Sequence, residues 1–360
     1  MVQTMMNDTV TLLPDNYKRG VRKDLRGTVS EISYPVMNYI NRSREFVTDQ
    51  NIDYEKIGRK AVKGECIHKK CNIYLPACYD RNDASKRYNV LYLLHGVGGD
   101  RFEWLNGSGR VDDNYVICNI VDNLIANGDI EPLIIVFPDG RSAWDWTDTS
   151  FNSDGTNMLG FYYFDYELRY DLIPFIETHY HTNSNPSDRS QEGLADSRLH
   201  RAIAGLSMGG MQSLNLIIGG YRCDSIAYTN TVSPWNNGLD TTLIAPGMLD
   251  MFAYIGAFSN APTSSDGKVL GSKIAASSHT LQLLYMTCGD ADGIAHQAGY
   301  EASVEGLTKA VGERLGDSYR VIIKDGEHDF NVWNNGAYNY LRLCYKEAKK
   351  QGNVAHVTLG

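Results

Sequence analysis

Short apolar runs alternate with amphipathic stretches along most of the chain. The apolar runs are mostly continuous, and they lie at 89–94, 132–137, 201–205, 252–258, 281–286 and 319–323. Continuous runs of this length are typical of strands covered on both faces, as in a parallel sheet. Amphipathic stretches separate them at about 115–127, 166–180, 208–219, 297–311 and 336–349. The alternation of strand and helix predicts an α/β fold with a mostly parallel sheet.

Two more apolar segments lie upstream of this alternation, at 27–34 and 71–76. We expect them to be edge strands of the same sheet, with the polar stretch 36–69 as a long excursion between them. The chain contains no internal repeat and no Pro-rich or Ser-rich linker. This organisation favours a single domain over residues 21–350.

Long irregular stretches interrupt the regular alternation at 139–165, 183–199 and 222–251. Loops of such length in a compact domain are usually lids or other functional segments. We therefore expect 139–165 or 222–251 to cap a pocket. The first 20 residues predict a loose arm, and residues 351–360 predict a C-terminal tail.

Composition and charge narrow the classes of protein. With 360 residues and 42% hydrophobic composition, the chain can bury a sizeable core, which excludes disorder and collagen-like repetition. The formal net charge of −9 disfavours nucleic acid and anionic membranes as partners. No apolar run approaches the roughly 20 residues of a membrane span, and the first residues lack a signal-peptide pattern. The seven cysteines include no CxxC pair, so we expect neither a metal nor a cofactor.

The most informative stretch is a G-x-S-x-G pattern formed by Gly205, Ser207 and Gly209. It lies between an apolar strand pattern and a helix pattern, which is the context of a nucleophile elbow. The small flanking residues allow a sharp turn that holds the Ser hydroxyl above the sheet. The start of a helix also favours developing negative charge. We predict that Ser207 is a nucleophile.

A serine nucleophile needs a base, which in this architecture follows the acid in chain order. His328 comes directly after the strand predicted at 319–323, so it emerges at the same sheet edge as Ser207. The acid should follow the preceding strand, where both Asp290 and Asp292 lie. A buried carboxylate there would fix the tautomer of His328. Spacing alone leaves the choice between the two Asp residues open.

An acyl-transfer site of this kind also needs an oxyanion hole. One N–H should come from Met208, directly after the nucleophile. The other should come from Val97 or Gly98 in the Gly-rich loop 93–100, which follows an early strand. We expect His95 in the same loop to shape the turn by hydrogen bonding rather than to act as a second base.

Four segments carry a resemblance to a known family: 88–99 (YNVLYLLHGVGG), 202–210 (AIAGLSMGG), 288–292 (CGDAD) and 326–333 (GEHDFNVW). Over roughly 70–345 the sequence resembles the feruloyl esterase branch of carbohydrate esterase family one, in the esterase D group of α/β-hydrolases. The resemblance implies a mostly parallel sheet of about eight strands with helices on both faces. It also implies that Asp292 is the acid, because the catalytic Asp of the relatives lies three residues after a strand-ending Gly.

The resemblance further implies a two-step acyl transfer from feruloylated or coumaroylated arabinoxylan, by a secreted enzyme. Acetyl xylan esterase is the first alternative, followed by an S-formylglutathione-type thioesterase and an acyltransferase. A catalytically silent carbohydrate-binding relative is the alternative that is not an enzyme. The segments 36–69 and 222–251 depart from the compact members of the family, so substrate preference follows less directly than chemistry.

A flat aromatic acid and a sugar chain both favour aromatic walls in the substrate site. Several aromatic residues lie in the irregular stretches, and we expect substrate-binding residues among Trp104, Trp144, Trp146 and Trp235. Trp333, in contrast, follows His328 closely, and we expect it to pack under the imidazole.

Overall fold

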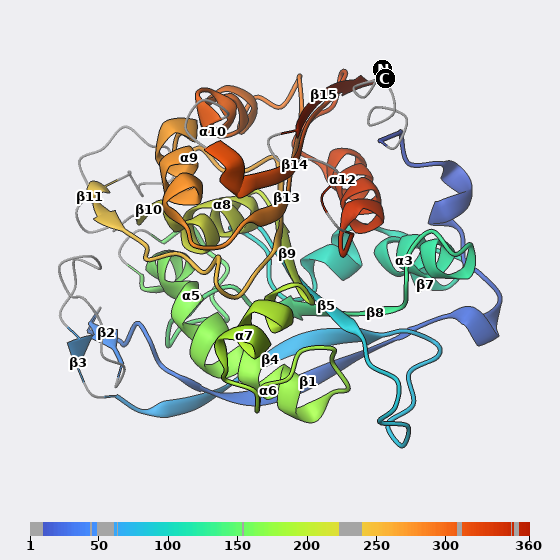
Figure 1. Ribbon diagram of the computed structural model, residues 1–360, viewed down its shortest axis with the longest axis horizontal. Coiled ribbons are helices and arrows are strands. Elements are labelled where there is room, and N and C mark those ends of the chain that lie inside the picture. Colours follow the sequence, from blue (N-terminus) through green and yellow to red (C-terminus); the bar gives the residue numbers. More distant parts are fainter. Residues whose placement is uncertain are drawn as a thin grey trace.

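The computed structural model describes residues 10–43, 45–48, 61–62, 64–152, 155–222, 240–307, 312–346, 348 and 353–360. Its main feature is a sheet of nine strands (Figure 1). In spatial order these are β1 (Thr28–Met37), β4 (Cys66–Leu75), β8 (Leu133–Pro138), β5 (Asn89–Leu94), β9 (Arg201–Leu206), β12 (Tyr254–Phe258), β13 (Leu281–Gly289), β14 (Leu315–Ile323) and β15 (Asn353–Leu359). The strands from β8 to β15 pair in parallel, whereas β4 runs antiparallel to both β1 and β8.

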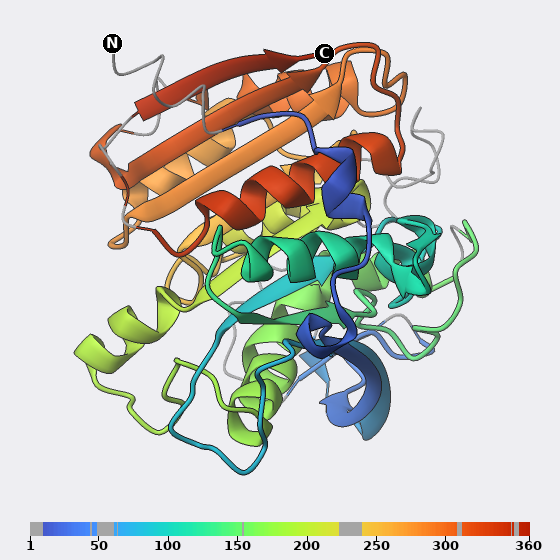
Figure 2. The same ribbon diagram turned by 90° about the vertical axis from the view of Figure 1, so that its right-hand side faces the viewer.

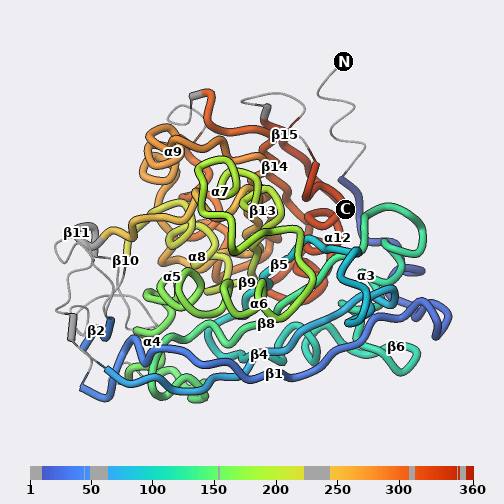
Figure 3. Tube along the Cα trace, turned by 60° about the horizontal axis from the view of Figure 1, so that its bottom comes forward, coloured from blue at the N-terminus to red at the C-terminus, as the bar shows by residue number. Residues whose placement is uncertain are grey.

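The burial of each strand follows from its sequence pattern. Every residue of β8, β9 and β12 is buried, because these continuous apolar runs are covered on both faces. The β1–β4 pair at one end of the sheet has exposed residues along much of its length, as an antiparallel edge with one solvated face does. Figure 3 shows this pair at one end of the sheet and β14 and β15 at the other.

Helices cover both faces of the sheet. The helices are α3 (Val116–Ala126), α4 (Asn157–Gly160), α5 (Phe164–Glu167), α6 (Ile173–His179), α7 (Gln191–Arg198), α8 (Met208–Leu214), α9 (Gly267–Ala276), α10 (Ala302–Val304) and α12 (Phe330–Leu343). One core cluster joins α3 and α12 to the sheet, and a second joins α6, α8 and α9 to the opposite face. Figure 2 looks onto the face covered by α3 and α12. Within the described ranges, none of these helices has the length and apolar character needed to cross a membrane.

Three short strand pairs lie outside the main sheet. They are β2 (Phe46–Val47) with β3 (Ala61–Val62), β6 (Arg110–Val111) with β7 (Asn114–Tyr115), and β10 (Tyr221–Arg222) with β11 (Asp240–Ile244). The first pair belongs to the excursion between β1 and β4, and the third borders the predicted 222–251 insertion. Residues 223–239 of that insertion lie outside the described residues.

Both predicted loose ends are wrong where the structure describes them. Val10 is buried, the Thr11 N–H donates to Asn339 Oδ1 at 3.0 Å, and the Tyr17 hydroxyl donates to Asp129 Oδ2 at 2.5 Å. The predicted tail 351–360 contains β15, which extends the sheet in parallel with β14. Ala355 and Val357 alternate with more exposed residues there, a period-two pattern too short to stand out in the sequence.

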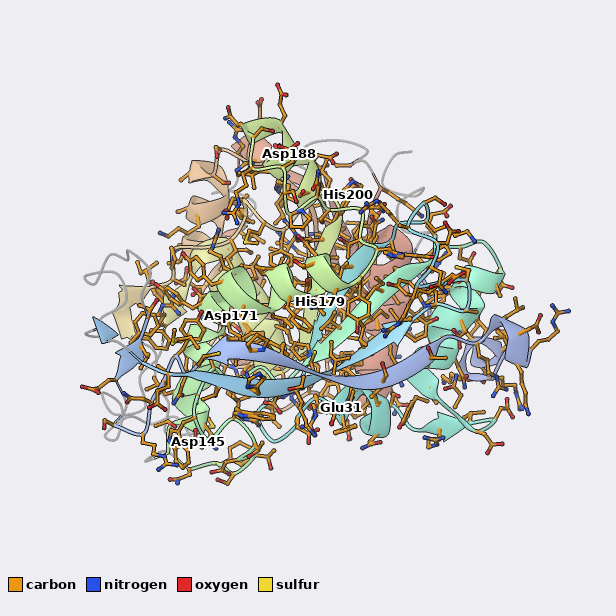
Figure 4. All side chains as sticks on the ribbon, turned by 90° about the horizontal axis from the view of Figure 1, so that it is seen from below. Glu31, Asp145, Asp171, His179, Asp188 and His200 are labelled. Atoms are coloured by element: carbon orange, nitrogen blue, oxygen red, sulfur yellow. The ribbon has the colours of Figure 1, made fainter. Side chains whose placement is uncertain are left out.

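The irregular stretches lie at different edges of the sheet. The stretch 139–165 follows the carboxyl end of β8, whereas 183–199 contains α7 and leads into the amino end of β9. Figure 4 shows this separation, with Asp145 at one extreme of the molecule and Asp188 and His200 toward the other. Only the first of these two stretches therefore lies at the sheet edge where the residue after β9 emerges.

Candidate active site

Ser207 occupies a sharp turn between β9 and α8. Its backbone has φ 52° and ψ −116°, a conformation that residues with a side chain rarely adopt. Two glycines make the turn possible. A Cβ on Gly205 would lie 2.4 Å from the backbone of Gly209, and a Cβ on Gly209 would lie 2.7 Å from the carbonyl oxygens of Leu94 and His95. The G-x-S-x-G pattern thus meets a steric requirement at both glycines.

His328 follows β14 and is paired with Asp292, which follows β13. The Nδ1 of His328 lies 2.8 Å from Asp292 Oδ2. Since the carboxylate can only accept, Nδ1 carries the proton and Nε2 is left as the basic nitrogen. The structure also separates the two Asp candidates, because Asp290 accepts a hydrogen bond from the N–H of Asp325 in a turn instead.

The Asp292 carboxylate is buried and held by several donors. Its Oδ1 accepts from the N–H groups of Ile294 and Ala295 at 3.0 and 2.8 Å, and its side chain is almost fully inaccessible. Burial alone would raise the pKa of this carboxyl. The hydrogen bonds from His328 and Ala295 outweigh burial and lower the pKa of Asp292 to about 2. Asp292 is therefore ionised at neutral pH and can stabilise a positively charged imidazole.

Ser207 and His328 line the same pocket, which has a volume of about 180 Å³. Its other lining residues come from the Gly-rich loop and the helical turn after it, the end of β9, the start of α8, α12 and three further loops. They are Gly96, Val97, Gly98, Glu103, Phe151, Leu206, Met208, Ala261, Pro262, Ile294 and Trp333. The pocket lies at the carboxyl edge of the sheet, as expected for an open α/β sheet.

In the described ranges, residues with unbonded backbone N–H groups line the pocket from two parts of the chain. Met208 begins α8 directly after Ser207, and Val97 and Gly98 lie in the loop after β5. Among the described residues, the N–H groups of these three residues have no hydrogen-bond partner. Such a set of free donors beside a serine can bind an oxyanion.

His95 has the shaping role expected of it. It is buried, its Nε2 accepts from the N–H of Gly140 at 2.9 Å, and its Nδ1 lies 2.7 Å from the carbonyl oxygen of Gly96. These contacts fix the proton on Nδ1 and engage both ring nitrogens. His95 is therefore not a free base.

The structure corrects part of the predicted set of substrate-binding tryptophans. Trp104 is buried, donates its indole N–H to Leu94 O at 2.8 Å, and packs edge-on against Phe258 and Phe330. It belongs to the core because it lies in a helical turn under the Gly-rich loop. Trp333 contacts the His328 ring edge-on at 5.0 Å, as expected.

The other three tryptophans have different positions. Trp144 is exposed with Arg42 over its ring at 4.6 Å, and Trp146 is half-buried beside Arg101. Neither is among the described residues that line the Ser207 pocket. Trp235 lies outside the described residues.

Three pocket or pocket-side residues did not enter the predicted site. Ile294 is an exposed apolar side chain at the pocket, and Glu103 and Arg141 hold the Gly-rich loop. Arg141 comes three residues after β8, so its position at the carboxyl edge of the sheet was a usable signal. Phe151, one of the aromatic residues of the irregular stretch 139–165, lies exposed at the pocket.

A serine on a strained strand-to-helix turn, with an Asp and then a His after later strands of a mostly parallel sheet, defines an α/β-hydrolase. Residues 68–335 match the Esterase family of proteins. The chain belongs to this family and is a carboxylic ester hydrolase by class. The predicted fold is confirmed, and the predicted relationship is confirmed at the level of the Esterase family.

Three known proteins illustrate the likeness. Endo-1,4-beta-xylanase Y of Acetivibrio thermocellus is 35% identical over 161 residues, which cover 44% of this chain and 12% of that protein. An endo-1,4-beta-xylanase/feruloyl esterase of Xylanibacter ruminicola is 27% identical over 279 residues, which cover 76% of this chain and 29% of that protein. The chain thus matches less than a third of the length of either relative.

Among solved structures, the chain is similar to a ferulic acid esterase of carbohydrate esterase family one from Anaeromyces mucronatus, in complex with ferulic acid. The TM-score is 0.60 at 22% identity, with 92% of this chain and 96% of that chain covered. At this identity the likeness establishes the fold.

Proposed function

We propose that the chain is a serine esterase that releases ferulic or p-coumaric acid from feruloylated arabinoxylan by a Ser207–His328–Asp292 mechanism. The observation that carries the proposal is the pocket in which Ser207, on its strained turn, and His328, paired with ionised Asp292, lie together. Membership of the Esterase family and the names of the matched relatives support the reaction and the type of substrate.

The first half of the reaction forms an acyl-enzyme. Nε2 of His328 takes the hydroxyl proton of Ser207 while the Ser207 oxygen bonds to the ester carbonyl carbon. The tetrahedral intermediate collapses when the bond to the sugar oxygen breaks, and His328 returns its proton to that oxygen. The ionised Asp292 stabilises the imidazolium during both transfers.

The second half repeats the chemistry with water. His328 takes a proton from a water molecule, the water oxygen bonds to the acyl carbon, and the Ser207–acyl bond breaks with return of the proton to Ser207. In each half the N–H groups of Met208 and of Val97 or Gly98 stabilise the oxyanion. Loss of one such donor lowers kcat by about a hundred- to a thousandfold in related chemistry.

The apolar mouth of the pocket favours an aromatic acyl group. Phe151 and Ile294 are 53% and 42% exposed and both line the pocket, so they provide an accessible apolar rim beside Ser207. The Phe151 ring lies beside Gly98, since a Cβ built on Gly98 would be 3.8 Å from it. A flat phenolic ring can pack between these side chains while its carbonyl reaches Ser207.

The sugar side of the substrate would extend outward from this mouth. Trp144 and Trp146 precede Phe151 in the same loop and are accessible to different degrees, so they remain candidates for contacts with the polysaccharide. Lid formation by 139–165 also remains a proposal, supported by the place of Phe151 at the pocket.

The experiment compares initial rates on methyl ferulate and acetylated xylan for the wild type and Ser207→Ala. We expect ferulate release by the wild type and a loss of several orders of magnitude in the mutant. Release of acetate alone would transfer the proposal to acetyl xylan esterase. Wild-type turnover retained by a folded Ser207→Ala protein would refute the serine mechanism.

A further inference from the structure

The Gly-rich loop 95–99 is held by hydrogen bonds to side chains inside and outside the loop. The N–H of Gly96 donates to Glu103 Oε2 at 2.5 Å. The carbonyl oxygen of Gly96 lies 2.7 Å from His95 Nδ1 and accepts from the N–H of Gly99 at 3.2 Å. Both the N–H and the carbonyl oxygen of Gly96 are thus engaged.

Arg141 binds the remaining part of the loop from below. Its Nη2 donates to the carbonyl oxygens of Val97 and Gly99, both at 2.7 Å. Its Nη1 donates to Asp139 Oδ1 at 3.1 Å, and the guanidinium lies over the Phe161 ring at 4.8 Å. Arg141 is completely buried, so its charge is compensated by Asp139 rather than by water.

These bonds determine where the free N–H groups point. In a trans peptide the C=O and the following N–H point in opposite directions. Because Arg141 holds the Val97 carbonyl, the N–H of Gly98 points away from the guanidinium. The Gly96 carbonyl is held by His95 and by the N–H of Gly99, and this orients the N–H of Val97 in the same peptide group. Val97 and Gly98 both line the Ser207 pocket, and in the described part of the chain their N–H groups have no partner.

We propose that Arg141 is a positioning residue for the oxyanion hole, acting through the carbonyl oxygens of Val97 and Gly99. The inference rests on the proposed esterase mechanism, which requires these N–H donors. Arg141 touches neither the ester nor Ser207. Its contribution is to fix the loop before the substrate binds, so that no reorganisation is needed when the oxyanion forms.

A Lys at this position tests the geometry while retaining the charge. A single ammonium is compact, and it cannot reproduce the planar fork that reaches two carbonyl oxygens and a carboxylate. Arg141→Lys therefore keeps the neutralisation of Asp139 and loosens the loop. Arg141→Met removes both effects and serves as the second variant.

Arg198 provides a matched control elsewhere in the fold. Like Arg141 it is buried and donates to backbone carbonyl oxygens, those of Leu249, Phe252 and Thr280, but in the described part of the chain it has no carboxylate partner. It lies at the end of α7, at the sheet edge opposite to Ser207. Arg198→Lys should therefore cost folding stability without affecting the oxyanion hole.

The test measures kcat and KM on methyl ferulate and on p-nitrophenyl acetate. For Arg141→Lys we expect kcat to fall by about 10- to 100-fold with KM within about twofold, because the lost interaction acts in the transition state. In Arg141→Met we expect a larger fall in kcat than in Arg141→Lys. Arg198→Lys should keep the wild-type kcat, even where its unfolding midpoint falls as far as that of Arg141→Lys.

A binding measurement separates positioning from general loosening. A phenylboronic acid forms a B–O bond with Ser207, the serine proton passes to His328, and one boron-bound oxygen occupies the oxyanion position. We expect its affinity to fall with kcat in Arg141→Lys, while the affinity for ferulic acid, a planar product, changes by less than about twofold.

Three outcomes would overturn the inference: an unchanged kcat in folded Arg141→Lys, an equal loss in Arg198→Lys, or an unchanged boronate affinity where kcat has fallen. A wild type that hydrolyses p-nitrophenyl acetate and not methyl ferulate would contradict the proposed substrate instead. The Arg141 comparison would then still decide the inference on the acetate ester, because one oxyanion hole serves both.

Discussion

Gly209, in the first turn of α8, lies directly against His95, at the end of β5. A Cβ on Gly209 would be 2.7 Å from the carbonyl oxygen of His95, closer than real Cβ atoms approach backbone. The helix that carries the Met208 N–H and the loop that carries the Val97 and Gly98 N–H groups are therefore in contact. The two halves of the candidate oxyanion hole are built as one unit.

Substitution of this glycine should damage both stability and activity. We expect Gly209→Ala to lower the free energy of unfolding by about 1–3 kcal/mol, as overpacking does, and to lower kcat more than tenfold by separating the two sets of donors. Urea unfolding and methyl ferulate hydrolysis measure the two effects. Gly293→Ala is the control, since a Cβ there meets no atom within 4 Å. Equal behaviour of the two variants would contradict the steric argument.

The acid can be identified by a pair of Asp-to-Asn changes. Asp292→Asn should lower kcat by about a thousandfold or more, because an amide beside Nδ1 no longer fixes the tautomer or stabilises the imidazolium. Asp290→Asn should keep kcat within a few-fold and cost about 1 kcal/mol of stability, because Asp290 only accepts from the Asp325 N–H. The measurement is kcat at pH 7 together with the unfolding midpoint. A larger loss of kcat in Asp290→Asn would exchange the two roles.

Asp171 should make the protein less stable as the pH rises. Asp171 lies between α5 and α6, beside the β1–β4 pair in Figure 4, and its carboxylate accepts from the Tyr39 hydroxyl at 2.7 Å. Burial raises its pKa to about 6, only partly offset by the Tyr39 hydrogen bond. The folded state therefore holds a proton that the unfolded state releases near pH 4, so stability is lost between about pH 4 and pH 6.

The variant Asp171→Asn should remove this pH dependence and gain on the order of 1 kcal/mol at pH 7.5, as measured by urea unfolding at pH 4, 5.5 and 7.5. For Asp250 the stability should change with pH in the opposite direction. Burial would raise the pKa of Asp250, but the ion pair with Arg169 lowers it. The variant Asp250→Asn should therefore be less stable than the wild type above pH 4. A gain at pH 7.5 in both variants would show that pH is not acting through these pKa values.

The apolar pocket mouth should discriminate between acyl groups. Phe151→Ala is expected to lower kcat/KM for methyl ferulate by about 10-fold or more, through loss of ring packing, and to leave p-nitrophenyl acetate within about twofold. Ile294→Ala should act in the same direction with a smaller loss. Steady-state kinetics give the ratio of kcat/KM for methyl ferulate to kcat/KM for p-nitrophenyl acetate in each variant. An equal loss on both esters would assign Phe151 a structural role.

Much of the arrangement of the candidate site could be predicted from local sequence. The strand before Ser207 and the helix after it follow from continuous apolar and amphipathic patterns, and the chain order of acid and base follows from the fold. The choice of Asp292 over Asp290 did not follow from spacing, because it depends on which carboxylate of the loop after β13 meets His328 on the β14–α12 loop. Such a choice is made by tertiary contact and not by any local pattern.

The wrong expectations share a physical cause. Trp104 was expected at the substrate because it lies near a loop, yet a helical turn carries it under the Gly-rich loop into the core. The strand β15 was missed because its alternation spans only seven residues and its partner β14 lies thirty residues upstream. For Arg141 the sequence indicates only a place just after β8 and not its buried bonds, because charged residues in polar loops are usually solvated.

The backbone of Ser207 has a thermodynamic consequence. A positive φ strains any residue that has a Cβ, by roughly 1–3 kcal/mol at such sites, whereas glycine adopts it freely. Ser207→Gly should therefore unfold at a higher urea concentration than the wild type, and Ser207→Ala should not. The folded protein would then be more stable with glycine at position 207 than with the candidate nucleophile. If Ser207→Gly gains stability and loses activity, the turn was selected for turnover at a cost in folding stability.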